Sequence, residues 1–501
     1  MIKKTLLFIV VVLGVYALTL KGQWIDSNQI QKLNELAKTS QAFESSHERS
    51  PFATTLALVS GHTVVLTKEQ GGFGAPDAGF LNGKYYSFFP PGVSLMILPL
   101  YVLGQAFGAG QLFAYMTIPI IMVVCLLLVF VICKRVFNLP ARAALSAAIT
   151  FGFGTTAWSY TITIYQHIPA TTLLLLLFYG TYEYGKDVKR FFWWPAVFVL
   201  LYGIGMFIDY PNAVLFLPLG FYLLSVGVRT FVSNSKQWLG IRPSLYISFL
   251  VIPVVIVGFF AYHQAAFGSW RILHNRLPRY TSNGVEGGAD KSTSIAAQKA
   301  DVSSVFSLSK VPYGVGTFVF SLDRGVFVFS PVLILGILGL LFYSGDRRKE
   351  YRTLIAIIVV NVLLYASTGD PWGGWSYGSR YLIPTMGILS IFTGLWVSKG
   401  GWRRQIFYSL FVASAGIALL GALTSNLIPP KPEAFGIGLQ SNILLNWNLL
   451  RANTTGGFVY NTFLAKIISL KIYYVFILSL LSVTTLLVLE RLYRKERNGS
   501  R

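Results

Sequence analysis

The chain has 501 residues, of which 54% are hydrophobic and only 12% are charged. A soluble domain carries about 25% charged residues, so the composition excludes an ordinary water-soluble protein and indicates one embedded in a bilayer. The net charge is +22, but the basic residues lie in short clusters between apolar segments, without a nucleic-acid-binding motif. We therefore assign these clusters to anionic lipid headgroups and expect no nucleic-acid partner.

The apolar segments predict an all-α polytopic membrane protein with about twelve transmembrane helices, since a spanning helix needs roughly 20 apolar residues. In lipid every backbone polar group must be paired internally, which favours helices. The predicted spans are 5–20, 111–133, 143–160, 164–184, 191–208, 211–228, 244–263, 325–343, 353–367, 381–397, 405–424 and 472–489. The first span resembles a signal peptide but has no clear cleavage site, so we expect it to remain as a helix.

The connections between the predicted spans alternate in charge. Those on one side are short and basic, as in "RRKEYR" at 347–352. The positive-inside rule places them, with both termini, in the cytoplasm, and we expect a multi-pass plasma-membrane protein. The connections 21–110, 264–324 and 425–471 then face outward. This topology requires 92–107 to lie on the outer surface, as its short length and Pro99 suggest.

Two regions follow from this topology. Residues 1–400 hold most of the predicted spans, with the outer loops 21–110 and 264–324. Residues 401–501 hold the C-terminal transmembrane helices and the outer loop 425–471. The stretch 281–310 is polar and rich in Gly and Ser, which predicts a flexible outer loop.

The outer connection "STGDPWGGWSYGSRYLIP" at 367–384 combines aromatic residues, glycines and Arg380. Trp372, Trp375 and Tyr377 are typical of an aromatic belt at the lipid headgroups, which is the simplest interpretation. The belt does not explain Gly373-Gly374, which permits positive φ or a close backbone approach. Nor does it explain an arginine at the start of an apolar span. Arginine suits phosphate oxygens and aromatic faces suit sugars, so the connection predicts a site for a phosphate-linked sugar.

The end of the first outer loop contains Asp77, followed by Lys84 and Tyr85. An acid and a base beside a membrane-lying helix could face a lipid-linked phosphate and an acceptor. The alternative is that Asp77 is a solvated loop acid.

Three further polar positions border the predicted outer face. Asp209 lies between two apolar runs. It is either a polar residue that ends a helical hairpin or a functional residue, because a charge at membrane depth is costly and is often kept for function. His167 begins a span, where a histidine is commonly interfacial. Asp323-Arg324 precedes another span, and an acid there is also favoured by the helix dipole.

Three catalytic motifs are excluded or absent. Residues 374–378 spell G-x-S-x-G, but a hydrolase elbow needs a strand and a soluble α/β sheet around it, which this chain lacks. We find no phosphate-binding Walker loop. The outer loops contain no Asp-x-Asp pair, so neither a catalytic metal nor a cofactor is implied.

Five segments, in order, resemble the GT-C superfamily of polytopic glycosyltransferases, and in particular bacterial relatives of protein O-mannosyltransferases and of the aminoarabinose lipid A transferase. They are "NGKYYSFFPPGVSLMILPLY" (82–101), "GTTAWSYTITIYQHIPA" (154–170), "FIDYPNAVLFLPL" (207–219), "LDRGVFVFSPVLILGILGL" (322–340) and "WGGWSYGSRYLIP" (372–384). The resemblance implies a GT-C fold whose large first outer loop carries interfacial helices. It also implies transfer of a sugar from a polyprenyl-phosphate carrier, with inversion, to a glycan, lipid or protein acceptor outside the membrane. The carrier is a substrate, and membrane lipids are the other expected partners.

This chain departs from the family pattern in its acid. Relatives commonly carry an acid soon after the first helix, often as Asp-Glu, whereas this chain has Asp26 without that pair. We favour Asp77 as the general base and keep Asp26 as the alternative. The leaving polyprenyl phosphate needs cations for its developing charge, for which we favour Arg380, with Lys84 and Arg324 as further candidates. The sugar and acceptor cavity would be lined by Trp372, Trp375, Tyr377, His167, Asp209 and Tyr85.

Other functions also fit a chain with many spans and large outer loops. A lipid-linked glycan ligase would need a long glycan donor, and a flippase would move lipid without cleaving it. A non-catalytic membrane scaffold would bind partners through 264–324 and 425–471. Release of free polyprenyl phosphate separates a transferase from a flippase and from a scaffold.

Overall fold

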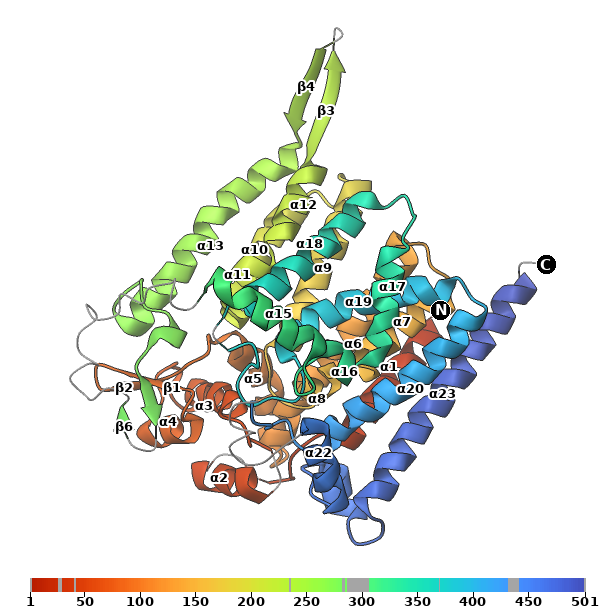
Figure 1. Cartoon of the computed structure of the whole chain (residues 1–501). Coiled ribbons are helices and arrows are strands. Elements are labelled where there is room, and N and C mark those ends of the chain that lie inside the picture. The colour runs from red at the N-terminus through yellow and green to blue at the C-terminus, as the bar shows by residue number, and fades with distance from the viewer. Residues whose placement is uncertain are drawn as a thin grey trace.

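A computed structural model describes residues 2–25, 29–39, 42–233, 236–281, 284–285, 306–368, 370–430 and 441–499. It is mostly helical, with long helices running alongside one another and small sheets at their ends (Figure 1). Within the described residues, five helices are long and apolar enough to cross a membrane: Gly110–Val136, Pro243–Phe267, Arg380–Ser398, Trp402–Leu423 and Leu470–Arg494. The protein is therefore a multi-pass membrane protein, and the count of twelve spans stays a prediction.

The predicted spans coincide with helices, several of them interrupted. These helices are α1 (Ile2–Thr19), α6 (Gly110–Val131) with η1 (Ile132–Val136), α7 (Ala141–Phe153), α8 (Ala157–Thr161), α9 (His167–Lys186), α10 (Trp194–Ile208), α11 (Asn212–Leu215), α12 (Leu217–Gly227), α13 (Pro243–Phe267), α16 (Val326–Phe329), η6 (Pro331–Leu333), α17 (Ile334–Leu341), α18 (Arg348–Ala366), η7 (Arg380–Leu382), α19 (Ile383–Ser398), α20 (Trp402–Leu423) and α23 (Leu470–Gly499). The break between α7 and α8, for example, contains the polar pair Thr155-Thr156.

The outer loops predicted from the sequence contain ordered elements. The first holds α2 (Ile30–Thr39), α3 (Ser46–Gly61), α4 (Lys68–Gly74), β1 (Ala78–Leu81), β2 (Lys84–Ser87) and α5 (Gly92–Gln105). The second holds η2 (His274–Arg276), β5 (Arg279–Thr281), β6 (Gly284–Val285), η5 (Leu308–Lys310) and α15 (Val311–Phe320), and the third holds α22 (Asn442–Arg451) and η8 (Tyr460–Leu464). Most of the stretch 281–310, predicted to be flexible, lies outside the described residues.

The prediction of an all-helical chain is wrong in one respect, because loop segments pair into two small sheets. One sheet has the strand order β2-β1-β5-β6, and the pair Ala78↔Tyr280 joins the first outer loop to the second. The other is a hairpin of β3 (Val228–Ser233) and β4 (Lys236–Ile241). These strands were missed because each is short and lies between strongly apolar runs that dominate the sequence pattern.

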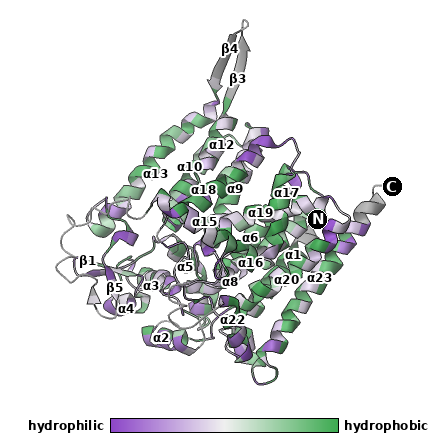
Figure 2. Cartoon of the chain, in the orientation of Figure 1, coloured by the Kyte–Doolittle hydropathy of each residue, from purple (hydrophilic) through white to green (hydrophobic). Residues whose placement is uncertain are grey.

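The two ends of the helix bundle differ in what they carry (Figure 1). One end holds the β3–β4 hairpin and the basic connection before α18, and the opposite end gathers α2, α3, α4, β1, β2 and α22. Hydrophobic residues run along α13, α20 and α23 between those ends (Figure 2). This arrangement agrees with the charge pattern, while the orientation of each end relative to the cytoplasm stays a prediction.

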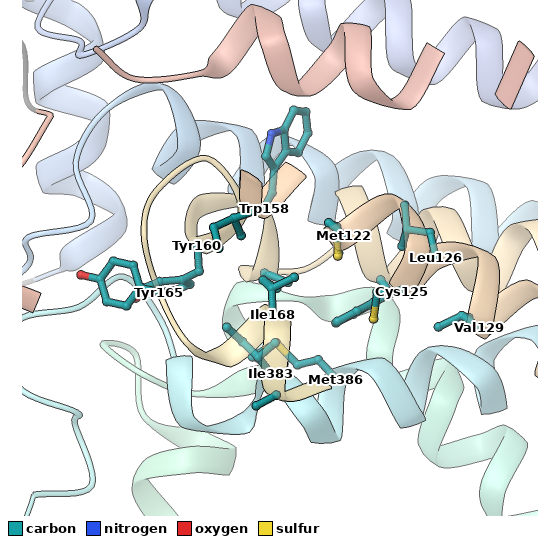
Figure 3. Packing of buried hydrophobic residues seen from close by; sticks show 14 of the residues in the cluster. Met122, Cys125, Leu126, Val129, Trp158, Tyr160, Tyr165, Ile168, Ile383 and Met386 are labelled. Carbon is teal, nitrogen blue, oxygen red and sulfur yellow. The ribbon is translucent and has the colours of Figure 1, made fainter. Parts of the chain in front are cut away.

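The helix α19 lies at the centre of the bundle and packs against α7, α9 and α17. Glycines let α17 approach it closely: a Cβ on Gly339 would lie 2.0 Å from the carbonyl oxygen of Phe392. Small residues at helix contacts are the usual device for packing in lipid. Figure 3 shows the buried cluster around Met122, Cys125 and Met386, with Tyr165 at its edge and its hydroxyl directed away from the cluster.

Candidate active site

Asp77 lies between α4 and β1. Hydrogen bonds to α4, to α3 and to the residue that follows β2 fix its backbone. Its N–H donates to the carbonyl of Gly74 (3.1 Å), and its own carbonyl accepts from Ser50 Oγ (2.6 Å) and from the N–H of Phe88 (3.0 Å). Its carboxylate Oδ2 accepts a hydrogen bond from Ser46 Oγ (2.7 Å). Among the described residues no donor reaches Oδ1. The side chain is therefore held in one orientation while one oxygen stays available to accept a proton.

Arg380 begins η7 and is only 9% exposed. Its guanidinium carbon lies 5.6 Å from the ring centre of Tyr165 and 5.5 Å from that of Tyr381. Within the described part of the chain its Nε has no hydrogen-bond partner. Asp77 lies within electrostatic reach of it. A buried cation with an unused N–H can bind an anionic ligand, because its remaining donor is unsatisfied without one.

The glycine pair places the preceding loop against this arginine. Gly373 has φ +72 and Gly374 has φ +62, so positive φ, one of the two possibilities that the sequence left open for this pair, is observed at both residues. A Cβ on Gly373 would lie 3.1 Å from Arg380 Nε. The N–H of Gly374 also donates to Asp370 Oδ2 (2.6 Å), which closes the turn.

Arg324 differs from Arg380 because backbone carbonyls already occupy most of its donors. It is fully buried and donates to the carbonyl oxygens of Trp372 (3.0 Å), Asp323 (2.8 Å), Gly374 (3.2 Å) and Ile428 (3.1 Å). Burial lowers the pKa of Arg324 to about 10. These bonds join the 372–374 turn to the third outer loop. They favour a bracing role over the phosphate contact that the sequence suggested.

Asp209 and His167 lie together with residues that sequence reasoning missed. Asp209 ends α10, and its Oδ2 accepts from Gln166 Nε2 (3.3 Å). Gln166 Oε1 in turn lies 2.6 Å from His47 Nε2. Burial raises the pKa of Asp209 to about 6. The ring centre of His167 lies 6.4 Å from that of His47, so α3, α9 and α10 converge on one polar cluster.

The three predicted aromatic residues of the 372–377 turn point to different surroundings. Tyr377 is fully buried, and its hydroxyl donates to the carbonyl of Ile417 on α20 (2.8 Å). Trp375 is 41% exposed. The ring of Trp372 lies 5.7 Å from that of Tyr313. Tyr377 therefore belongs to the helix core, and the rings recorded over the Arg380 guanidinium are those of Tyr165 and Tyr381.

Lys84 and Tyr85 lie in β2, where they pair with the end of β1 that is farther along the strand from Asp77. Lys84 is exposed at the start of β2, beside the turn that joins β1 to β2. Asp77 precedes the other end of β1, and a four-residue strand extends roughly 10 Å or more. The ring of Tyr85 packs against Phe80 (5.0 Å) and Tyr280 (4.8 Å) within the small sheet.

The polar run "ESSHER" at Glu44–Arg49 is the main feature that sequence reasoning missed. Ser45 caps α3 by accepting from the N–H of His47 (3.1 Å), and the Ser45-x-x-Glu48 spacing of a capping box was the available signal. Glu48 Oε2 accepts from the hydroxyl of Tyr115 (2.6 Å), and burial raises the pKa of Glu48 to about 7. The run therefore directs the start of α3 toward the site.

A buried lysine ties this run to the first helix. Lys21 is fully buried, with its Nζ 3.7 Å from Glu44 Oε1. Glu44 also accepts from Ser425 Oγ (2.8 Å) and from the N–H groups of Asn426 (2.8 Å) and Leu427 (3.1 Å). The end of α1, the first outer loop and the third outer loop are thereby joined next to the candidate site.

The remaining sequence predictions concern the alternative base, a serine nucleophile and a metal site. Asp26, the alternative base, lies outside the described residues. The hydroxyl of Ser376 is buried and donates to the carbonyl of Trp372 (2.9 Å), consistent with the exclusion of a serine nucleophile. In the described ranges no three His, Cys, Asp or Glu side chains are grouped to hold a metal ion.

Residues 90–257 match the family model described as dolichyl-phosphate-mannose-protein mannosyltransferase. No curated protein matches the chain by sequence. The match to the family model confirms the resemblance found in the sequence.

Two solved structures of ArnT share the fold with this chain. The apo crystal structure of ArnT from Cupriavidus metallidurans has a TM-score of 0.50 at 13% identity, over 96% of this chain and 74% of that chain. ArnT from the same organism bound to undecaprenyl phosphate gives 0.51 at 13% identity, with the same coverage. The archaeal oligosaccharyltransferase AglB from Archaeoglobus fulgidus, in complex with an inhibitory peptide and a dolichol-phosphate, gives 0.44 at 10% identity over 92% of this chain and 59% of that chain. The ArnT matches show that the fold is of the GT-C type.

Proposed function

We propose that this chain is a polyprenyl-phosphate-sugar-dependent glycosyltransferase, which passes one sugar from such a carrier to an acceptor at the outer face of the membrane. The observation that carries the proposal is the pairing of two groups. Asp77 is fixed by Ser46 with its Oδ1 unused, and it lies within electrostatic reach of the buried Arg380. A base beside a cation is what displacement of a phosphate leaving group requires.

The reaction is a single displacement at the anomeric carbon. Asp77 Oδ1 takes the proton of the acceptor hydroxyl while that oxygen forms a bond to the anomeric carbon. The bond from that carbon to the phosphate oxygen breaks, and the polyprenyl phosphate leaves with the electron pair. Arg380 stabilises the negative charge that develops there. One displacement inverts the anomeric configuration, and no step requires a metal ion.

The surroundings of the site suit a lipid-linked donor. The site lies where α3, α9 and α10 meet the 372–380 turn, at the end of the apolar helices. The carrier chain would remain between these helices and the lipid, as the fold shared with undecaprenyl-phosphate-bound ArnT suggests. The acceptor would enter from the outer loops, with both termini in the cytoplasm as the basic connections predict.

The test is replacement of Asp77 by Asn, which can still accept the hydrogen bond from Ser46 and so preserves the local fold. Membranes holding either protein are given polyprenyl-phosphate mannose, glucose or aminoarabinose, and free polyprenyl phosphate and transferred sugar are measured. We expect Asp77→Asn to lower turnover by about 10²–10⁴-fold. Glu69→Gln, which removes an exposed acid from the same outer loop, should transfer normally.

Near-normal turnover of Asp77→Asn would exclude Asp77 as the base, and a parallel Asp26→Asn variant would then identify the alternative. Movement of lipid across the membrane without release of polyprenyl phosphate would indicate a flippase. Transfer only from long glycan donors would indicate a ligase. Mass spectrometry of the purified protein for co-bound polyprenyl-phosphate sugar would name the donor.

A further inference from the structure

Asp209, Gln166 and His47 form a hydrogen-bonded chain whose direction is fixed at its acidic end. An ionised carboxylate only accepts hydrogen bonds, so the amide NH₂ of Gln166 must face Asp209 Oδ2 (3.3 Å). The amide oxygen Oε1 must then face His47 Nε2, at 2.6 Å. An oxygen acceptor requires a proton on that ring nitrogen. The chain therefore selects the tautomer of His47 that carries its hydrogen on Nε2.

The other ring nitrogen, Nδ1, is consequently a lone-pair acceptor. Burial and the nearby charge of Arg380 lower the pKa of His47 well below its usual value, so the ring is neutral near pH 7. The ring stacks on Tyr165 at 4.6 Å and contacts Phe89 at 4.0 Å. Over the described ranges no protein group donates to Nδ1, although His47 is only 7% exposed. This nitrogen is not among the fully buried partnerless atoms of the described residues, so it keeps some exposed surface through which a ligand can reach it.

The position of His47 points to the reaction centre. The preceding residue, Ser46, holds the carboxylate of Asp77 (2.7 Å). Tyr165, on which His47 stacks, also contacts the guanidinium of Arg380 (5.6 Å). The remaining ionisable neighbours are His167, with its ring centre 6.4 Å away, and Glu48, which acts on Tyr165. His47 is thus linked through Ser46 to the carboxylate assigned as the base and through Tyr165 to the cation assigned to the phosphate.

We propose that the Asp209–Gln166–His47 chain fixes His47 so that its Nδ1 accepts a hydrogen bond from a substrate hydroxyl group, on the donor sugar or on the acceptor. Asp209 and Gln166 are positioning residues that act through His47. The hydroxyl contact rests on the proposed function, since it needs a sugar or an acceptor at this site. The tautomer does not, because the protein alone sets it.

The first experiment measures the tautomer directly. The full chain, labelled with ¹⁵N-histidine in detergent micelles, contains five histidines, and the signals of His47 are those lost in His47→Asn. We expect a neutral ring with its proton on Nε2, and loss of this single tautomer in Gln166→Leu. A proton on Nδ1, a charged ring, or an unchanged tautomer in Gln166→Leu would overturn the proposal.

The second experiment separates the ligand contact from a structural role. In His47→Asn the amide lies near the place of Nδ1, whereas in His47→Gln it lies near the place of Nε2. With the polyprenyl-phosphate sugar that supports turnover, we expect about tenfold lower kcat/KM for Gln, and a smaller loss for Asn. A purely structural bond to Gln166 predicts the reverse order, which would overturn the ligand contact.

Two further readouts complete the test. A higher KM for the donor assigns the hydroxyl to the sugar, and a higher KM for the acceptor assigns it to the acceptor. Equal kcat/KM for wild type, Asn and Gln would overturn the contact. If the wild-type protein transfers no sugar, the proposed function and the hydroxyl contact both fail, whereas the tautomer measurement still stands on its own.

Discussion

Replacement of Arg324 by Lys tests whether this buried arginine braces the site or binds phosphate. The guanidinium donates to four carbonyls that lie on three segments: its own turn, residues 372–374 and the start of the third outer loop. A lysine ammonium is a compact point charge and cannot span these separated oxygens as the planar guanidinium does. The substitution keeps the positive charge and removes only the hydrogen bonds that join the three segments.

The expected loss follows from the bonds that lysine cannot make. If two of the four hydrogen bonds are lost, and a bond to a charged group contributes about 1.5–3 kcal/mol, the cost is about 3–6 kcal/mol. Much of this cost falls locally on the 370–380 turn. We therefore expect a lower Tm in detergent, and faster proteolysis within that turn.

The assay compares wild type, Arg324→Lys and Arg271→Lys, which changes an exposed arginine of the second outer loop and should behave as wild type. Thermal unfolding, limited proteolysis and donor KM are measured on the same preparations. An unchanged Tm and unchanged proteolysis, together with a raised donor KM, would refute the bracing argument and return Arg324 to the phosphate-binding set.

Two further predictions concern Arg380 and Glu48. Arg380→Gln removes the charge beside the leaving group and should lower kcat/KM at limiting donor by about 10–100-fold, with Arg451→Gln as an exposed control; an unchanged rate would exclude a phosphate contact. Burial raises the pKa of Glu48 from 4.5 to about 7, so its contribution to stability is complete below pH 4.5 and is lost as the pH rises through about 7. Wild type should therefore lose Tm relative to Glu48→Gln between pH 5 and pH 8, and a constant difference between the two proteins would contradict the raised pKa.

The sequence predicted the helices well because their cause is local. A run of apolar residues in lipid must pair its own backbone groups, and each predicted span coincides with one or more helices. The positive φ of Gly373 and Gly374 was one of the two possibilities that the sequence left open, since glycine adopts that conformation without the steric cost that a Cβ brings. The family resemblance came from the same local segments and is confirmed by residues 90–257.

Other features depended on contacts between distant segments, which a residue type cannot reveal. Arg324 and Arg380 both precede apolar spans, yet four carbonyls occupy the first, while the Nε of the second has no partner among the described residues. His47 and Gln166 are 119 positions apart and meet only where the N-terminal ends of α3 and α9 lie together. The sheet that joins β1 to β5 likewise pairs two different loops.

The sequence by itself therefore determined a helical membrane protein, its apolar segments and the family it resembles, because hydrophobicity and charge act along the chain. Only the tertiary structure decided which polar groups share the site. Whether a buried donor or acceptor is free to bind a ligand depends on whether another segment supplies its hydrogen-bond partner. The role of each arginine and histidine here is set by that pairing.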